Sequence, residues 1–275
     1  DQKLPKKTFY RLCPELHNGG KTPAGVPVRV QLLGQHPQWL AENAQTAIEL
    51  GSPGVDLNFG CPAKTVNKSK GGAVLLKETQ TLYDIVKAVR DAVPAEIPVS
   101  AKIRPGFEGK SLAIENAIAI TEAGASELVV HARTKTEGYK PPAYWDWIAK
   151  IKQHTDIPLV ANGEIWNAED AQRCQSQSEC TNLMIGRGAL AMPNLALSIK
   201  EGVAPMPWSE LAALLIQYSG YEIFGDKGKY YPNRIKQWCG YLKRQYPEAE
   251  VLFNDIRRLT KSQDIVDVLA RQADI

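Results

Sequence analysis

The segment most suited to chemistry covers residues 55–62, where a short apolar run ends in Asn58, Gly60, Cys61 and Pro62. Such a run is typical of a buried β-strand, and the glycine and the proline end it and turn the chain. Cys61 therefore stands at the carboxyl end of a strand, where α/β proteins place their reactive groups. A small buried residue that happens to precede a turn is the alternative interpretation.

A second pair of candidates is Lys102 and Arg104, at the end of an apolar run over residues 98–104. Residues two apart on a strand face the same side. Because lysine is rarely buried without a partner, Lys102 could stabilise an anionic flavin ring or a phosphate, or form a Schiff base. Arg104 suits a planar ligand that carries carbonyl groups. Both side chains could instead be solvated at a strand end.

Polar residues end the other predicted strands as well. They are Gln31, Asn58, His131, Asn162 with Glu164, and Arg187. The glycines Gly163 and Gly186 within the last two groups would let backbone N–H groups approach a phosphate, and the helix that follows each adds its positive N-terminus. We therefore expect anion binding at the last two strand ends, with two ordinary glycine turns as the alternative.

The elements that position these residues alternate along the chain as strand and helix. Strands are predicted over residues 28–33, 55–58, 98–104, 127–131, 157–162 and 182–187. Intervals of about 25–45 residues are those of parallel strands joined by crossover helices. No GxGxxG follows the first strand, which weakens the case for an open doubly wound sheet, and a ring of polar strand ends favours a TIM (β/α)8 barrel.

A closed barrel needs eight strands, so six predicted β/α units imply two further strands before the first residue of this sequence. Residues 1–27 contain four prolines and are predicted to be mostly loop. Beyond Pro205 only helical periodicity is visible. We expect a catalytic barrel domain over residues 1–204, truncated at its N-terminus, and a small all-helical domain over residues 205–275.

The helical domain contains a basic and aromatic stretch over residues 227–258. Its basic residues are Lys227, Lys229, Arg234, Lys236, Lys243, Arg244, Arg257 and Arg258, and its aromatic residues are Tyr230, Tyr231, Trp238, Tyr241 and Tyr246. Basic and aromatic side chains together suit an RNA backbone and unstacked bases. An ordinary solvated helical face is the alternative.

Composition narrows the setting. The 275 residues have a net charge of +3, which permits a polyanionic partner without requiring one, and no apolar run approaches the length of a membrane span. The five cysteines show no CxxC spacing, and there are only four histidines. We therefore expect no metal site, and a reduced, cytoplasmic compartment fits best.

Six motifs together resemble those of the tRNA-dihydrouridine synthases in order and spacing. They are Asp56-Leu57-Asn58-Phe59-Gly60-Cys61-Pro62, Gly71-Gly72-Ala73, Lys102-Ile103-Arg104, His131-Ala132-Arg133-Thr134, Ala161-Asn162-Gly163-Glu164-Ile165 and Ile185-Gly186-Arg187-Gly188-Ala189-Leu190. Each motif alone is weak evidence for the family, but six motifs in the same order and spacing are specific to it. The stretch from Arg234 to Tyr246 is similar to the C-type bacterial members, which act on position 16 in the tRNA D-loop.

The resemblance implies an FMN-dependent TIM barrel with a helical, tRNA-recruiting domain, with NADPH or NADH as reductant. We expect a monomer. Hydride would pass from the flavin to C6 of a flipped-out uridine, and Cys61 would protonate C5. The positions that match flavin-binding residues are Gln31, Lys102, His131, Asn162, Gly163, Glu164, Gly186 and Arg187. Those that match residues holding the uracil are Asn58, Arg104 and Tyr139.

The sequence departs from the family pattern in lacking its first strand, a segment that contains Pro-Met and lies under the flavin. That absence puts flavin affinity and barrel closure in question. Two alternatives follow from the residues: another barrel enzyme, either a flavoprotein of the dihydroorotate dehydrogenase type or a Schiff-base lyase using Lys102, and a non-enzymatic tRNA-binding scaffold.

Overall fold

The computed structural model describes residues 2–220 and 228–273 of the chain. Lys227, part of the basic stretch predicted above, lies outside these residues. The chain divides into two compact units. The first contains Asp1–Gly163 and Arg173–Met184, and the second contains Glu164–Gln172 and Ile185–Ile275.

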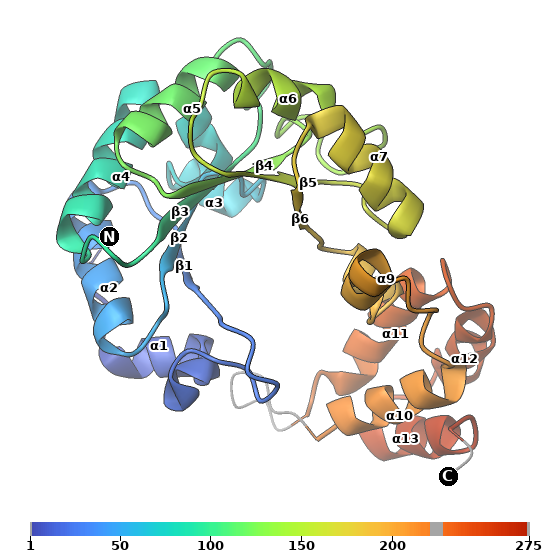
Figure 1. Cartoon of the computed structure of the whole chain (residues 1–275). Helices are drawn as coiled ribbons and strands as arrows, with labels where there is room; N and C mark the ends of the chain where they lie inside the picture. The colour runs from blue at the N-terminus through green and yellow to red at the C-terminus, as the bar shows by residue number, and fades with distance from the viewer. Residues whose placement is uncertain (1, 221–227, 274–275) are drawn as a thin grey trace. The chain divides into compact units, whose positions relative to one another are not determined.

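The first unit is built on a six-stranded parallel sheet whose strands follow one another in chain order (Figure 1). The strands are β1 (Val30–Leu32), β2 (Val55–Asn58), β3 (Val99–Ile103), β4 (Glu127–His131), β5 (Leu159–Asn162) and β6 (Asn182–Met184). A doubly wound sheet would reverse its strand order at a switch point. The unbroken order is that of consecutive β/α units of a (β/α)8 barrel, so the predicted fold class is confirmed.

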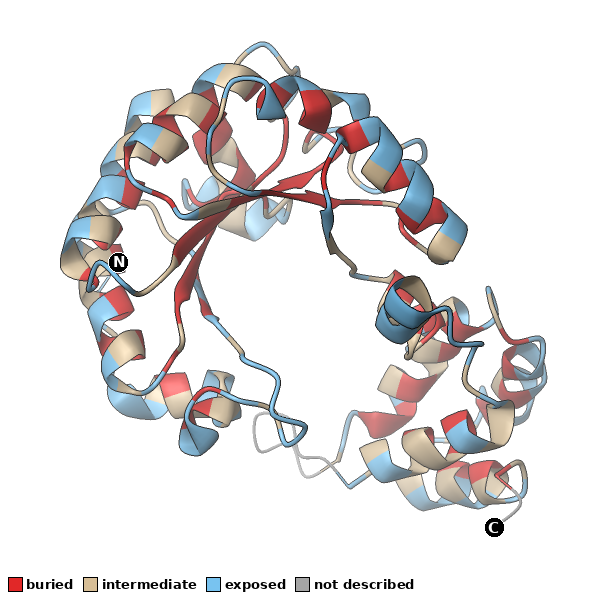
Figure 2. Cartoon of the chain, in the orientation of Figure 1, coloured by how far each residue is buried: buried red, intermediate tan, exposed pale blue. Residues whose placement is uncertain are grey.

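Crossover helices follow the strands and cover one side of the sheet, with α2, α4 and α5 in succession (Figure 1). They are α2 (Pro37–Glu49), α4 (Thr79–Ala92), α5 (Ala113–Glu122), α6 (Asp146–Lys152) and α7 (Ala168–Ser178). The inward stripe of α4 shows why the sequence forms this layer, since Leu82, Ile85, Val86 and Val89 are all fully buried. Figure 2 shows the central strands buried and the outward helix faces exposed.

Residues 1–27, predicted to be mostly loop, contain helix α1 (Lys6–Leu12) and the 3-10 helix η1 (Pro14–Asn18), of 7 and 5 residues. The prediction holds for the larger part of this region but misses these two short helices. The prolines begin these helices instead of preventing them: Pro5 is the N-cap residue of α1, and Pro14 is the first residue of η1. A proline at a helix start loses no hydrogen bond, because the N–H there has no partner within the helix.

The segment between β2 and α4 contains α3 (Lys64–Lys68) and the 3-10 helix η2 (Gly72–Lys77). Asn116 of α5 is fully buried and fixes η2 in place. Its Nδ2 donates to the carbonyl of Leu76 at 2.9 Å, and its Oδ1 accepts from the Thr79 hydroxyl at 2.7 Å. The path after β2 is therefore defined by buried polar contacts.

In the second unit every regular element among the described residues from 185 onward is a helix, as predicted for residues 205–275. The helices are α8 (Gly188–Ala191), α9 (Leu195–Glu201), α10 (Trp208–Tyr218), α11 (Tyr231–Leu242), α12 (Glu248–Ile256) and α13 (Ser262–Ala270). Four of them, α10 to α13, share a core that includes Leu215, Ile235 and Leu252. This unit also includes α8 and α9, so the domain boundary at residue 204 stays a prediction.

Candidate functional site

The parallel register brings the predicted polar residues of the first unit onto one face of the sheet. Asn58 lies opposite Lys102, and His131 lies opposite Asn162. Gln31 lies opposite Asp56, two residues before Asn58, so it faces the same side. The sheet therefore collects side chains from five strands at its carboxyl edge, the edge at which barrels place their chemistry.

A chain of hydrogen bonds joins the first three strands on this face. Asp56 Oδ2 accepts from Gln31 Nε2 at 2.6 Å, and Gln31 Oε1 accepts from Asn58 Nδ2 at 2.8 Å. Asn58 Oδ1 in turn accepts from the backbone N–H of Gly60 at 3.0 Å. The other carboxylate oxygen of Asp56 accepts from the Ser100 hydroxyl at 2.9 Å. A predicted flavin-binding residue and a predicted uracil-binding residue thus touch each other directly.

Lys102 reaches across the sheet to β5. Its Nζ donates to Asn162 Oδ1 at 3.2 Å, and Asn162 Nδ2 donates to the carbonyl of Met184 at 2.7 Å. Burial and the nearby charge of Arg104 lower the pKa of Lys102 to about 8, while Asp56 acts in the opposite direction. The ammonium is therefore held in a confined place with one neutral partner, and it can donate to a ligand.

His131 is buried and uncharged. Burial, followed by the charges of Arg104 and Lys102, lowers its pKa to about 2. Its ring meets that of Tyr139 edge to face, with centroids 5.8 Å apart. Within the described residues its buried Nδ1 has no hydrogen-bond partner. An unsatisfied buried polar atom is costly, and a polar ligand at this face would supply the missing partner.

The backbone around Cys61 is held tightly, while its side chain is partly exposed. The Cys61 carbonyl accepts from Asn67 Nδ2 at 2.9 Å and from the N–H of Ala73 at 3.1 Å. Gly72 makes this approach possible: its φ is +66°, and a Cβ there would lie 2.9 Å from the Cys61 carbonyl oxygen. The Gly71-Gly72-Ala73 motif therefore positions the cysteine.

Arg104 is only 2% exposed, and its guanidinium donates hydrogen bonds to backbone carbonyls. Its Nε donates to Gly60 at 2.8 Å, and its Nη1 donates to Thr134 at 2.9 Å and Gly138 at 3.0 Å. Its guanidinium also lies 5.2 Å from the ring centroid of Tyr139. Arg104 thus ties the loop before Cys61 to the loop after β4 that carries Tyr139, which is half exposed.

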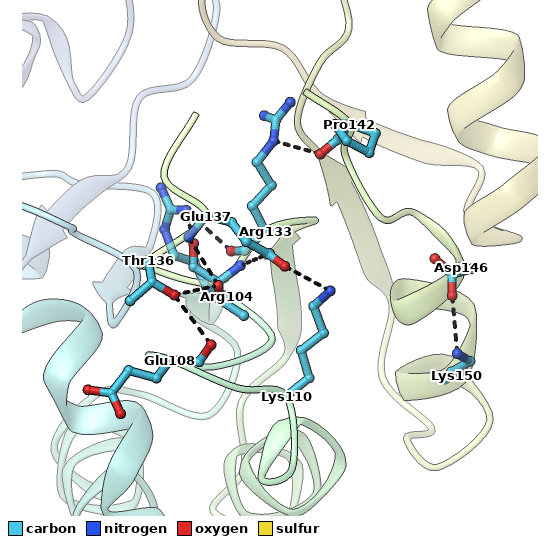
Figure 3. A network of polar contacts seen from close by, with 10 residues as sticks. Arg104, Glu108, Lys110, Arg133, Thr136, Glu137, Pro142, Asp146 and Lys150 are labelled. Carbon is cyan, nitrogen blue, oxygen red and sulfur yellow. Dashed lines mark hydrogen bonds and ion pairs between the residues drawn. The ribbon is translucent and has the colours of Figure 1, made fainter. Parts of the chain in front are cut away.

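The loops after β3 and β4 are also joined by ionic contacts (Figure 3). Lys110 pairs with Glu137 at 3.1 Å, and Glu137 accepts from the N–H of Thr134 at 2.7 Å. The hydrogen bond from Thr134 and the Lys110 charge outweigh the effect of burial, which acts in the opposite direction, so that the pKa of Glu137 is lowered. Thr136 adds a hydrogen bond to the carbonyl of Glu108 at 3.3 Å. These contacts hold the Tyr139 loop as one piece with the neighbouring loop.

The remaining predicted residues, Glu164, Gly186 and Arg187, belong to the second unit. Glu164 accepts from Trp166 Nε1 at 2.9 Å and lies 3.8 Å from Arg187, whose guanidinium is 5.1 Å from the Trp166 ring. A Cβ at Gly186 would meet no atom within 4 Å, so its backbone is open to a ligand. Helix α8, which follows, has only four residues, so anion binding there would depend on backbone N–H groups and Arg187.

The sequence analysis missed three buried residues of the first unit. Asp56 anchors the hydrogen-bond chain; an acidic residue within an apolar strand was the available signal. Trp145 is 6% exposed and donates from Nε1 to the carbonyl of Gly163 at 2.9 Å. Arg133, fully buried, donates from Nε to the carbonyl of Pro142 at 3.0 Å. No periodicity marks these last two contacts.

The donors and acceptors at the predicted flavin-binding positions are of the kinds that a flavin ring requires. The first unit offers an ammonium from Lys102, amides from Gln31 and Asn162, and the unsatisfied Nδ1 of His131 on a single face. In the second unit, Gly186 and Arg187 offer an open backbone and a cation. A ring of carbonyl and nitrogen atoms with a phosphate tail requires groups of these kinds.

Within residues 2–220 and 228–273, no group of three or more His, Cys, Asp or Glu side chains could hold a metal ion. In the same part of the chain, no helix has both the length and the hydropathy that a membrane crossing requires.

Comparisons with known proteins agree with the motifs. A family model described as dihydrouridine synthase (Dus) matches residues 1–273. A protein named tRNA-dihydrouridine(16) synthase from Shewanella oneidensis is 58% identical over 269 residues, covering 98% of this chain and 85% of its own. A protein of the same name from Escherichia coli K12 is 54% identical, covering 96% of this chain and 84% of its own.

A search of solved structures finds weaker similarity. Morphinone reductase aligns with a TM-score of 0.46 and 17% identity over 62% of this chain and 49% of its own. A similarity this low has no bearing on function.

Gly72→Ala should destabilise the chain and disturb Cys61. The new Cβ would meet the Cys61 carbonyl, and the positive φ disfavours any residue with a side chain, so we expect the free energy of unfolding to fall by about 1–3 kcal/mol. Urea unfolding measures this. Gly109→Ala is the matched control, because a Cβ there meets nothing within 4 Å. Equal stabilities for the two variants would contradict the role given to Gly72.

Lys102 should lose its proton near pH 8 in the ligand-free protein. The unfolded chain keeps this proton up to about pH 10.5, so between these values the group's contribution to the free energy of unfolding rises with pH. After reductive ¹³C-methylation, the NMR resonance that disappears in Lys102→Met should titrate near pH 8. A midpoint near 10.5 would show that the ammonium is not confined as described.

Proposed function

The chain belongs to the dihydrouridine synthase family, and from this membership we propose that it reduces uridine to 5,6-dihydrouridine in the D-loop of tRNA. The observation that carries the proposal is the position of Cys61 shortly after β2, next to Gly60, whose N–H donates to Asn58 and whose carbonyl accepts from Arg104. A base in a loop is the least costly to flip out of its stack. The names of the relatives support position 16.

FMN, when bound, supplies the hydride for C6 of the uracil, and NADPH supplies the electrons that restore it. Gln31, Lys102, His131, Asn162 and Gly163 of the first unit would hold the cofactor. Glu164, Gly186 and Arg187, which belong to the second unit, also match flavin-binding positions of the family. The neutral imidazole of His131 and the ammonium of Lys102 give one face both a polar and a cationic partner.

Cys61 would donate its thiol proton to C5, so that hydride and proton together saturate the C5=C6 bond. This role requires a thiol that is accessible and fixed in place, and Cys61 is partly exposed with its carbonyl bound twice. Asn58, Arg104 and Tyr139 would hold the uracil. Arg104 also anchors the Tyr139 loop, because its Nη1 donates to the backbone carbonyls of Thr134 and Gly138.

The basic helices of the second unit would bind the tRNA backbone. Lys229, Lys243, Arg244, Arg257 and Arg258 all lie exposed on or beside α11 and α12. Arg244 also stacks on Trp166, with its guanidinium 3.9 Å from the ring centroid. Such cationic and aromatic surfaces bind RNA phosphates and bases.

We further propose NADPH or NADH as the reductant, a monomer, and a cytoplasmic location, where tRNA is modified. The family match favours reduction of tRNA over the alternatives of a dihydroorotate-type flavoprotein, a lyase or a scaffold. No observation on Lys102 beyond its lowered pKa supports a Schiff base.

Cys61→Ala should slow dihydrouridine formation about 10²- to 10⁴-fold, the range that a general acid contributes. Reduction of the flavin by NADPH should be unchanged, because it needs no proton from this thiol. Single-turnover reaction of the reduced enzyme with unmodified tRNA measures the first rate, and flavin absorbance measures the second. Cys13→Ala is the control; an unchanged product yield in Cys61→Ala would show that another group is the acid.

Arg257→Gln combined with Arg258→Gln should weaken tRNA binding and reduce its salt dependence. Each phosphate contact adds about 0.7–0.9 to the slope of log K against log salt concentration, so losing two contacts should lower the slope by about 1–2. Filter binding over a range of salt concentrations measures this. Lys6→Gln with Lys87→Gln, on the first unit, is the charge-matched control. The same slope for both pairs would place the RNA surface elsewhere.

A further inference from the structure

Asp56 is a buried carboxylate to which neither the motif resemblance nor the proposed reaction gives a role. It lies on β2, is 9% exposed, and faces the side of the sheet that carries the candidate site. Its two oxygens accept from Gln31 at 2.6 Å and from Ser100 at 2.9 Å. Lys102 and Arg29 are the charged groups that act on it.

The hydrogen bonds that begin at Asp56 have only one consistent direction. An ionised carboxylate can only accept, so Gln31 must turn its NH₂ group toward Asp56 and its oxygen toward Asn58. Asn58 then donates to Gln31 and presents its own oxygen to the N–H of Gly60. A peptide N–H can only donate, so the N–H of Gly60 requires the same amide orientations as the carboxylate of Asp56.

This direction decides what the two amides offer to ligands. Each amide nitrogen has a second N–H and each amide oxygen a second lone pair, and their places depend on which way the amide is turned. Because Gln31 matches a flavin-binding position and Asn58 a uracil-binding position, the orientation of both sites depends on the same carboxylate. This series of hydrogen bonds ends at Gly60, the residue before Cys61.

We propose that Asp56 is a positioning residue that fixes the amide orientations of Gln31 and Asn58, and so aligns the flavin site with the uracil site. The inference rests on the proposed function for the identity of the two ligands, but the orientation itself is a property of the chain alone. Asp56 touches neither reacting atom and acts through Gln31 and Asn58.

The test compares Asp56→Ala with Asp56→Asn. Alanine removes the acceptor, and we expect FMN affinity and the single-turnover rate with tRNA each to fall about 10- to 100-fold, as for loss of a hydrogen bond to a charged group. Asparagine can still accept from Gln31 through its oxygen, so it should recover much of the loss. Asp91→Asn, on the exposed end of α4, is the matched control and should equal wild type.

A double-mutant cycle separates positioning from general support of the fold. In an Asn58→Ala background the amide chain is already broken, so adding Asp56→Ala should cost far less tRNA rate than it does in wild type. If Asp56→Ala lowered the tRNA rate by the same factor in the Asn58→Ala background as in wild type, the proposal would be overturned. An Asp56→Ala variant with wild-type FMN affinity and rate would also overturn it.

NMR of the ligand-free protein decides the case independently of catalysis. The side-chain NH₂ resonances of Gln31 and Asn58 should both shift in Asp56→Ala, and should be close to wild type in Asp56→Asn. Unshifted resonances in Asp56→Ala would overturn the inference even in an active enzyme. Failure of wild type to reduce tRNA would instead contradict the proposed function, and the resonances would still report the orientation.

Discussion

The parallel register of the sheet is the constraint on which the candidate site depends. Since side chains alternate between faces along a strand, a shift of one residue would move Asn58, Lys102 and His131 to the opposite face together. The buried partners at each step, such as Leu57 beside Asn58, prevent that shift, because they would become exposed. Hydrophobic burial on the helix-covered side therefore fixes the polar groups on the other.

Much of this arrangement could be predicted from the sequence. Short apolar runs separated by amphipathic helices mark β/α units, and in such units the residues that follow a strand gather at one edge. This is why Cys61, Lys102 and His131 could be named as candidate site residues before any contact was known. The α2 and α4 helices were equally predictable, because their apolar stripes are regular.

Contacts between distant segments could not be predicted. The prolines near the N-terminus were interpreted as a sign of loop, although the start of a helix tolerates proline. Only the burial of Phe9 and Leu16 shows that the short helices α1 and η1 pack against the rest of the protein. Three carbonyl partners of Arg104 belong to residues 29 to 34 positions further along the chain, and a fourth, Gly60, lies 44 positions before it. No local pattern records such pairings, because they depend on how two loops meet in space.

Positively charged side chains outnumber negatively charged ones around His131 and Lys102. Lys102, Arg104 and Arg133 all act on His131, and together with burial they keep its imidazole neutral. Asp56 is the acid that acts on Lys102, and its own pKa is raised by burial. A face with more cationic than anionic groups stabilises an electron-rich ligand placed against it. A flavin gains electrons when it is reduced, so a flavin held against this face, as proposed, would be stabilised in its reduced state by the excess of positive charge.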